Sequence, residues 1–399
     1  MSSVSKIPKL LVDIHTHLYL PRYASLLRTR TIAPRILSRT TTSGQSEERL
    51  LILENEPSGG RPVGPQYWDR DEKLKFMDKH GIDISIVSTA NPWLDFLPYP
   101  EALSLAKDLN TDLESYCATS PELASSPSIR RLYALGLLPL VPNAPPDALA
   151  SFVRDLAANH PNIRGIIMGT RGIGKGLDDP ALESMWAALA ETGLVVFLHP
   201  HYGLSSGENV WGEQDNGHVL PLALGFPFET TAAVTRLILA GTLDRHPDLR
   251  ILLAHAAGAL PALSSRLSSC IVHDPRVAAR LQHDARFYLG RLYYDAVAYG
   301  SAELEFVSAT IGRADHFDSS SSVVVGKTAG SVEDKERGSA RIMFGTDHPF
   351  FPPIEDGKEE AKWQSVVENL EAVRDVPCWS EEAKDGVRGR NALRIFGII

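Results

Sequence analysis

Short apolar runs alternate with longer amphipathic stretches along most of the chain. Apolar runs that continue without polar interruption are typical of strands buried on both faces, whereas apolar positions three and four residues apart indicate helices. Candidate strands lie at residues 10–17, 84–88, 132–137, 163–168, 194–198, 251–254, 292–295 and 341–344. Candidate helices lie at residues 69–80, 101–118, 146–159, 180–191, 228–240, 259–270, 302–312, 359–374 and 380–396.

This alternation predicts an α/β protein with a (β/α)8 barrel and extra helices at its C-terminal end. An open, doubly wound sheet is the alternative. The polar residues at the strand ends favour the barrel: His15 and His17 end the first run, His199 the fifth and His255 the sixth, and Asp347 follows the eighth. A barrel brings these ends together over one mouth, whereas an open sheet would spread them along a crevice.

Two insertions interrupt the pattern, at about residues 22–66 and 318–340. The first is rich in Arg, Thr, Ser, Gly and Pro, and we expect a long irregular loop. The second contains a run of four serines and is expected to be solvated. We predict that residues 1–399 form a single domain built on one barrel.

The composition, 43% hydrophobic and 22% charged residues, is that of a soluble globular protein. A net charge of -9 without any block of Lys and Arg argues against a nucleic-acid partner. We find neither a signal peptide nor an apolar run of membrane-spanning length, and we expect no membrane association and a cytoplasmic location. The three scattered cysteines fit a reducing compartment.

Imidazole and carboxylate donors without a thiolate suit Zn²⁺ or Mn²⁺. We therefore predict that His15, His17, His199 and Asp347 bind one divalent metal ion, with Zn²⁺ favoured, Mn²⁺ possible and no organic cofactor. His201 is an alternative to His199, although two residues beyond the strand it should have turned into the loop. The histidines in predicted helices and loops are expected at the surface: His80, His160, His246, His273, His283 and His316.

Residues 169–176, Gly-Thr-Arg-Gly-Ile-Gly-Lys-Gly, nearly spell a phosphate-binding loop. Gly176 stands where that loop needs a magnesium-binding Ser or Thr. A tight turn that lets the backbone approach the barrel mouth is the favoured interpretation.

Several motifs carry a family resemblance. His-x-His after the first strand, His199-Pro200 after the fifth, Ala-His-Ala-Ala-Gly at residues 254–258 and Gly-Thr-Asp-His-Pro-Phe at residues 345–350 resemble the amidohydrolase superfamily. They are similar in particular to its metal-dependent non-oxidative decarboxylases, the branch of aminocarboxymuconate semialdehyde decarboxylase. The resemblance runs from about Val12 to Glu355 and departs at Ala257, where glycine is usual, and in the second insertion.

Within that branch, longer motifs are similar to the fungal decarboxylases of uracil-5-carboxylate. These motifs are residues 12–17, 90–93, 174–180, 198–204, 217–227, 270–274 and 347–355. The resemblance implies a small carboxylate substrate, uracil-5-carboxylate, that loses CO₂ to give uracil. It also implies that Asp347 donates the proton to C5 and that His255 orients Asp347 or assists the transfer.

The resemblance further implies that Arg61, Asn91 and Phe350 bind the substrate and that Arg266 reaches the active site of a neighbouring subunit in a homodimer. Other activities stay open. A salicylate or dihydroxybenzoate could be the substrate, or the protein could hydrolyse amides or lactones with metal-activated water. A binding module with a structural metal is less favoured, because four ligands leave a position open.

Overall fold

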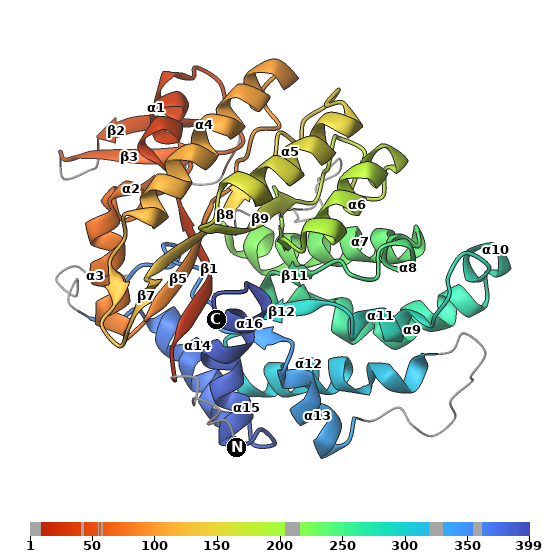
Figure 1. Ribbon diagram of the computed structural model, residues 1–399. Helices are drawn as coiled ribbons and strands as arrows, with labels where there is room; N and C mark the ends of the chain where they lie inside the picture. The colour runs from red at the N-terminus through yellow and green to blue at the C-terminus, as the bar shows by residue number, and fades with distance from the viewer. Residues whose placement is uncertain are drawn as a thin grey trace.

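The computed structural model describes residues 9–40, 44–54, 56, 59–203, 216–318, 330–353 and 361–399. Its centre is a sheet of eight parallel strands that pair in the order in which they occur in the chain (Figure 1). The strands are β1 (Val12–Leu18), β5 (Ile84–Thr89), β8 (Leu132–Leu137), β9 (Ile163–Gly169), β10 (Val195–His199), β11 (Ile251–Leu253), β12 (Tyr293–Asp295) and β13 (Ile342–Met343).

Backbone hydrogen bonds between the first strand and the segment after the last one close this sheet into a barrel. The N–H of Ile14 donates to Phe344 O at 3.1 Å, and the N–H of Asp347 donates to His15 O at 2.7 Å. The N–H of His17 donates to His348 O at 2.7 Å. The predicted (β/α)8 barrel is therefore confirmed, and its seam includes three of the predicted metal ligands, His15, His17 and Asp347.

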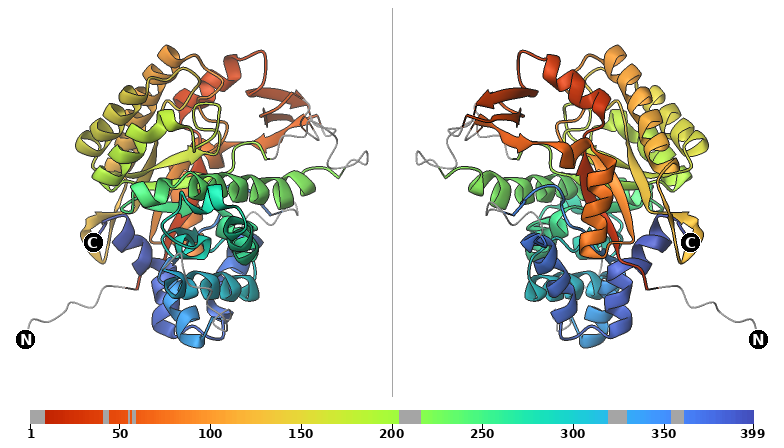
Figure 2. Two further views of the ribbon diagram at one scale, coloured as in Figure 1. Left: turned by 90° about the vertical axis from the view of Figure 1, so that its right-hand side faces the viewer. Right: turned by 90° about the vertical axis from the view of Figure 1, so that its left-hand side faces the viewer.

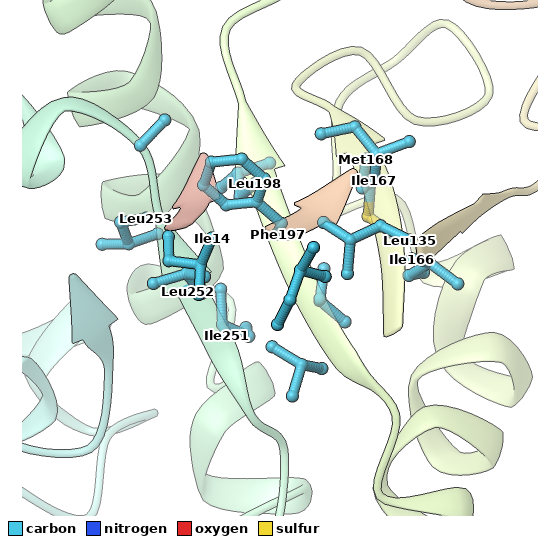
Figure 3. Close-up of a cluster of buried hydrophobic side chains, with 14 of the residues drawn as sticks. Ile14, Leu135, Ile166, Ile167, Met168, Phe197, Leu198, Ile251, Leu252 and Leu253 are labelled. Carbon is cyan, nitrogen blue, oxygen red and sulfur yellow. The ribbon is translucent and has the colours of Figure 1, made fainter. Parts of the chain in front are cut away.

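Large apolar side chains fill the interior of the barrel. Figure 3 shows this core around Phe197 of β10, with Ile14 of β1 and Leu252 of β11. All three residues are fully buried. The ring centroid of Phe197 lies 4.9 Å from that of His15, so the apolar core forms the floor of the barrel mouth.

The predicted helices surround the barrel, most within a few residues of their expected bounds. Asp69 caps the first one by accepting a hydrogen bond from Asp71 N–H at 2.8 Å, and Gly81 ends it at φ 70°. The major helices are α3 (Arg70–His80), α4 (Tyr99–Ala118), α5 (Pro146–Asn159), α6 (Glu183–Thr192), α7 (Phe226–Leu239), α9 (Leu260–Val272), α12 (Ser301–Gly312) and α14 (Gln364–Asp375).

Shorter elements occur between these helices and at the chain's end. The helix expected at residues 380–396 is divided into α15 (Glu381–Asp385), a π-helical turn η6 (Gly386–Arg390) and α16 (Asn391–Ile395). The hairpin of β6 (Glu122–Leu123) and β7 (Ser126–Arg130) is not among the predicted elements. The other short elements are η2 (Pro180–Leu182), η3 (Pro221–Gly225), α8 (Thr242–Arg245), η4 (His255–Ala257), α10 (Pro275–Ala278), α11 (Ala285–Leu289) and η5 (Arg313–Phe317).

The prediction of an irregular loop over residues 22–66 is wrong. This insertion contains α1 (Pro21–Thr29), an antiparallel sheet of β2 (Arg35–Thr40), β3 (Ser46–Leu51) and β4 (Arg61–Val63), and the start of α2 (Pro65–Trp68). Its buried apolar residues include Ile36, Leu50 and Val63. Figure 2 shows this sheet projecting on the side of the molecule where η3 and α7 begin, away from the C-terminus.

The second insertion is partly helical. Residues 319–329 lie outside the described residues, and α13 (Val332–Ser339) follows them. Ser331 and Asp334 form a capping box at its start, which stabilises the first turn of α13. The single-domain organisation stays a prediction.

One helical stretch, Pro221–Leu239, is long and apolar enough to cross a membrane by length and composition. The expectation that no apolar run reaches membrane-spanning length is therefore wrong for this stretch. Half of its most apolar window is buried inside the protein, and it includes the buried carboxylate of Glu229. A core helix of a soluble protein passes the same test, and Val234, Leu237 and Ile238 of this helix belong to the apolar core.

Candidate active site

Four buried side chains from three parts of the chain meet at the barrel mouth. One donor atom each of His15, His17, His199 and Asp347 lies within 4.8 Å of the others. The Nε2 atoms of His15 and His17 are 3.1 Å apart, and Asp347 Oδ1 lies 3.2 Å and 3.3 Å from them. The structure thus brings together the four residues that sequence analysis predicted as metal ligands.

The other ring nitrogen of two of these histidines makes a hydrogen bond away from the cluster. Nδ1 of His17 lies 3.0 Å from Ser88 Oγ, and Nδ1 of His199 lies 2.9 Å from Pro200 O. A carbonyl only accepts, so Nδ1 of His199 carries the proton. This tautomer leaves the Nε2 lone pair of His199 available to a cation.

Asp295, at the end of β12, holds the third histidine, and sequence analysis gave it no role. Its Oδ2 lies 2.6 Å from Nδ1 of His15 and also accepts the backbone N–H of His255 at 2.9 Å. Its Oδ1 accepts the N–H of Ala256 at 2.8 Å. The sequence does place Asp295 at the end of the seventh predicted strand, as it places the predicted ligands at other strand ends. Asp295 therefore orients one predicted ligand and fixes the backbone of a predicted catalytic residue.

The charges of the cluster favour a bound cation. Burial lowers the pKa of His15, but the carboxylates of Asp347 and Asp295 outweigh it and raise that pKa to about 10. Burial would raise the pKa of Asp347, but protonated His15 holds it well below its usual value. Burial lowers the pKa of His17 to about 4 and that of His199 well below its usual value. Without metal, the proton on His15 therefore supplies the positive charge that the carboxylates of Asp347 and Asp295 favour at this place.

The donor set fits a divalent metal ion. It offers three imidazoles and one carboxylate, and Asp347 Oδ1 is a buried atom without a well-formed hydrogen bond among the described residues. A divalent cation would satisfy that oxygen and take the place of the proton on His15.

Asp347 and His255 both adopt backbone conformations that non-glycine residues rarely adopt. The φ angle is 56° at Asp347 and 54° at His255, and the next residues, Ala256 and Ala257, have φ 51° and 67°. Nε2 of His255 lies 3.7 Å from Oδ2 of Asp347. The structure therefore places the predicted catalytic pair side by side, close enough for one small movement to form a hydrogen bond.

A cavity of about 880 Å³ opens above the cluster. It is lined by His199, His255 and Asp347 and by the predicted substrate-binding residues Arg61, Asn91 and Phe350. The guanidinium carbon of Arg61 lies 5.4 Å from the Phe350 ring centroid, and the centroid of His17 lies 5.6 Å from it. Much of the remaining wall is apolar, with exposed side chains that include Val219, Leu224, Phe228, Phe306 and Phe351.

Three other residues that were considered from the sequence do not belong to the cluster or to the cavity wall. Arg266 lies on the exposed surface of α9 and does not line the cavity. His201, the alternative ligand, is outside the cluster; its Nε2 lies 3.0 Å from Asp95 Oδ1. His80 was expected at the surface but is buried, where its Nδ1 donates to Phe76 O at 2.8 Å.

The glycine-rich turn after β9 accommodates an arginine. A Cβ on Gly176 would lie 2.6 Å from the guanidinium of Arg236, which forms an ion pair with Asp178 at 2.6 Å. Gly176 also has φ 106°. The tight-turn interpretation of residues 169–176 thus has a physical reason, a close side-chain approach and a backbone conformation that favour glycine.

The sequence is similar to proteins of known activity. Residues 12–398 match the amidohydrolase family. The chain belongs to this family. It is 24% identical over 342 residues to the 2-amino-3-carboxymuconate-6-semialdehyde decarboxylase of Dictyostelium discoideum, covering 85% of this chain and 79% of the relative. It is 27% identical over 354 residues to the gamma-resorcylate decarboxylase of Rhodococcus jostii, covering 82% and 93%.

Two solved structures of decarboxylases also resemble this chain over nearly its full length. An apo IDCase from Metarhizium anisopliae is 39% identical, with a TM-score of 0.80, over 98% of this amidohydrolase and 97% of that chain. The 5-carboxyvanillate decarboxylase LigW from Sphingomonas paucimobilis shares the fold at 20% identity, with a TM-score of 0.71, over 98% and 100%. This amidohydrolase is therefore a metal-dependent decarboxylase, a carbon–carbon lyase, as the sequence motifs predicted.

Proposed function

We propose that this amidohydrolase removes CO₂ from uracil-5-carboxylate, or isoorotate, and releases uracil. The likeness to IDCase over nearly the full length of both chains supports this substrate most directly. The fungal uracil-5-carboxylate decarboxylase motifs at Asn91, His199 and Asp347 lie on the wall of the cavity, which agrees with it.

His15, His17, His199 and Asp347 would hold one divalent ion. Zn²⁺ is favoured by nitrogen and oxygen donors at a compact four-donor site, and Mn²⁺ is the alternative. Bound there, the cation would supply a Lewis acid that anchors the substrate carboxylate and its neighbouring ring oxygen. Elemental analysis of protein purified without added metal distinguishes the two ions.

Asp347 would protonate C5 of the pyrimidine. The proton passes from the carboxyl group to C5, the bond between C5 and the carboxylate then breaks, and its electron pair returns to the ring as CO₂ leaves. The pKa of Asp347 is held well below its usual value, so this carboxyl group is ionised before the substrate binds and its proton must come from water or from the substrate. A substrate carboxylate close to Asp347 would raise the pKa of Asp347 and favour that protonation.

Arg61, Asn91 and Phe350 would orient the pyrimidine. Arg61 offers guanidinium donors to ring carbonyls, and Asn91 uses its Nδ2 on His201 O and keeps its Oδ1 for a ring N–H. Phe350, on the cavity wall, would stack on the ring. Water is kept away from the reacting carbon mainly by the apolar remainder of the wall.

A substrate panel tests the proposal. We expect release of uracil from uracil-5-carboxylate and loss of that activity in Asp347→Asn, with Asp147→Asn on the exposed part of α5 as the control. No uracil from the wild-type protein would overturn the substrate assignment.

A salicylate- or dihydroxybenzoate-type acid is the second candidate. The gamma-resorcylate decarboxylase relative and the apolar cavity wall favour it. In the same panel, this candidate predicts a phenol as product. Ester and amide substrates in that panel test the hydrolase alternative.

We also propose a homodimer in the cytoplasm. Arg266 is exposed on α9, as an arginine that reaches a partner's active site must be, and exposed apolar side chains surround the cavity mouth. All three cysteines are free, which agrees with a reducing compartment. Sedimentation should give a dimer, and Arg266→Ala should reduce turnover; a fully active monomer would contradict the proposal.

A further inference from the structure

Lys73, on α3, is a buried cation outside the cavity. Only 3% of the residue is exposed, although lysine is almost never buried without a partner. Its Nζ donates a hydrogen bond to Thr16 Oγ1 and lies 3.4 Å from Nδ1 of His348 and 3.9 Å from Oδ2 of Asp13. None of the three contacts is with a residue of the metal cluster.

The partners of Lys73 are nevertheless chain neighbours of that cluster. Thr16 lies between His15 and His17 on β1, where successive side chains point to opposite faces of the strand. His348 follows Asp347 directly. Lys73 therefore lies on the outer side of the barrel wall, behind the residues whose side chains converge on the inner side.

A chain of hydrogen bonds connects Lys73 with both sides of the barrel seam. Thr16 Oγ1 donates to His348 O at 3.2 Å, and the N–H of His348 donates to Thr346 Oγ1 at 3.1 Å. Thr346 in turn donates through Oγ1 and N–H to the carboxylate of Asp13, at 2.8 Å and 3.0 Å. Lys73 supplies the positive charge beside this buried carboxylate.

Asp347 lies between the two anchored residues Thr346 and His348. Its φ of 56° is unfavourable for a residue with a side chain, so its neighbours must hold it in place. The His348 ring is also packed between Phe76 and Trp363, at centroid distances of 3.7 Å and 4.8 Å. Both flanks of Asp347 are thus fixed, one of them through Lys73.

We propose that Lys73 is a positioning residue: it holds the Thr346–His348 segment against β1 and thereby sets the position of Asp347 relative to His15 and His17. Cation affinity and proton transfer then depend on a residue that contacts neither the cation nor the substrate. The part of this inference that concerns turnover rests on the proposed function, whereas the part that concerns cation affinity does not.

Two substitutions at Thr16 test this inference without removing a buried charge. Thr16→Val removes the hydroxyl that links Lys73 to His348 at nearly constant volume, and Thr16→Ser retains it. We expect Thr16→Val to weaken Zn²⁺ binding by about 10-fold to 100-fold in a chelator competition, and to lower kcat with little change in KM. Thr16→Ser should stay within about 3-fold of wild type.

Lys73→Met should reproduce the loss of Zn²⁺ affinity, with Lys75→Met as the control. Lys75 lies on the same helix, with 70% of its side chain exposed. Folding is checked by circular dichroism, and if Lys73→Met does not fold, Thr16→Val decides. A folded Thr16→Val protein with wild-type Zn²⁺ affinity and kcat would overturn the inference. If the wild type does not convert uracil-5-carboxylate, the affinity measurements still test the role of Lys73.

Discussion

Asp295 shows how a single buried side chain can organise a metal centre that it does not enter. One oxygen fixes the Nδ1 side of His15, and the two oxygens together hold the N–H groups of His255 and Ala256. A carboxylate behind a metal-binding imidazole fixes its orientation and raises its basicity. The same residue thus joins the predicted ligand set to the predicted catalytic histidine.

We predict that Asp295→Asn weakens Zn²⁺ binding by about 10-fold to 100-fold. The amide keeps the shape of the side chain but removes the charge that raises the basicity of His15. Chelator competition at fixed pH measures the effect, and Asp147→Asn serves as the control for a surface carboxylate. Unchanged affinity would show that Asp295 is not needed for ligand orientation.

The proton on His15 leads to a second prediction. Its pKa of about 10 means that His15 is protonated below that pH, whereas His17, with a pKa of about 4, is already neutral at pH 7. Zn²⁺ binding at pH 7 should therefore release about one proton per ion. Calorimetry in buffers with different ionisation enthalpies counts it, and binding without proton release would contradict this assignment.

Among the secondary-structure elements, the turn η4 has the most unusual backbone dihedral angles. Three successive residues with side chains, His255, Ala256 and Ala257, have positive φ, and Gly258 follows at φ 61°. A Cβ on Gly258 would lie 2.4 Å from Pro227 O, so this position requires glycine. Ala257, where the resemblance leads us to expect glycine, accepts a conformation that costs an L-residue free energy.

We predict that Ala257→Gly raises the free energy of unfolding by about 1 kcal/mol, because glycine adopts φ 67° without a steric penalty. Ala157→Gly on the exposed side of α5 is the matched control, and it should lower the free energy of unfolding by about 0.5–1 kcal/mol. Urea denaturation measures both. Equal destabilisation by the two substitutions would show that the turn is not strained at Ala257.

The strands and helices of the barrel could be predicted because each buried strand is a continuous apolar run. The insertion at 22–66 could not, because the buried Ile36, Leu50 and Val63 are separated by charged and irregular stretches without clear alternation. The four cluster residues could be found since each closes or follows an apolar run. Asp295 also ends such a run, but its role depends on the orientation of the His15 ring, which no local pattern specifies.

For the molecule as a whole, the buried histidines link stability to pH. The lowered pKa values of His17 and His199 give stability that is present above pH 6.5 and is lost as the pH falls, toward about 4 in the case of His17. The raised pKa of His15 acts in the opposite direction, because its contribution is present below pH 6.5 and is lost as the pH rises toward 10. The combined contribution of these histidines is therefore greatest near their ordinary pKa.

We predict that the metal-free protein is more stable near pH 6.5 than at pH 5 or pH 8; above about pH 8 the buried Lys73, whose pKa burial lowers to about 8, contributes in the opposite direction. Urea unfolding at several values between about pH 5 and pH 8 measures the profile. Saturating Zn²⁺ should flatten the alkaline side, because the ion replaces the proton on His15. A metal-free profile that rises steadily from pH 5 to pH 8 would contradict the charge assignment.

The seam between β1 and the segment after β13 also has a consequence for biosynthesis. Asp13 and Thr346, which join there, are separated by 333 positions. At about 5–20 residues per second, a ribosome needs roughly 20 to 70 s to reach that far. A nascent polypeptide presents His15 and His17 well before Asp347, so the four-donor pocket is complete only after the segment that follows β13 has been translated. The four donors can therefore hold an ion together only after both sides of the seam have been made and joined.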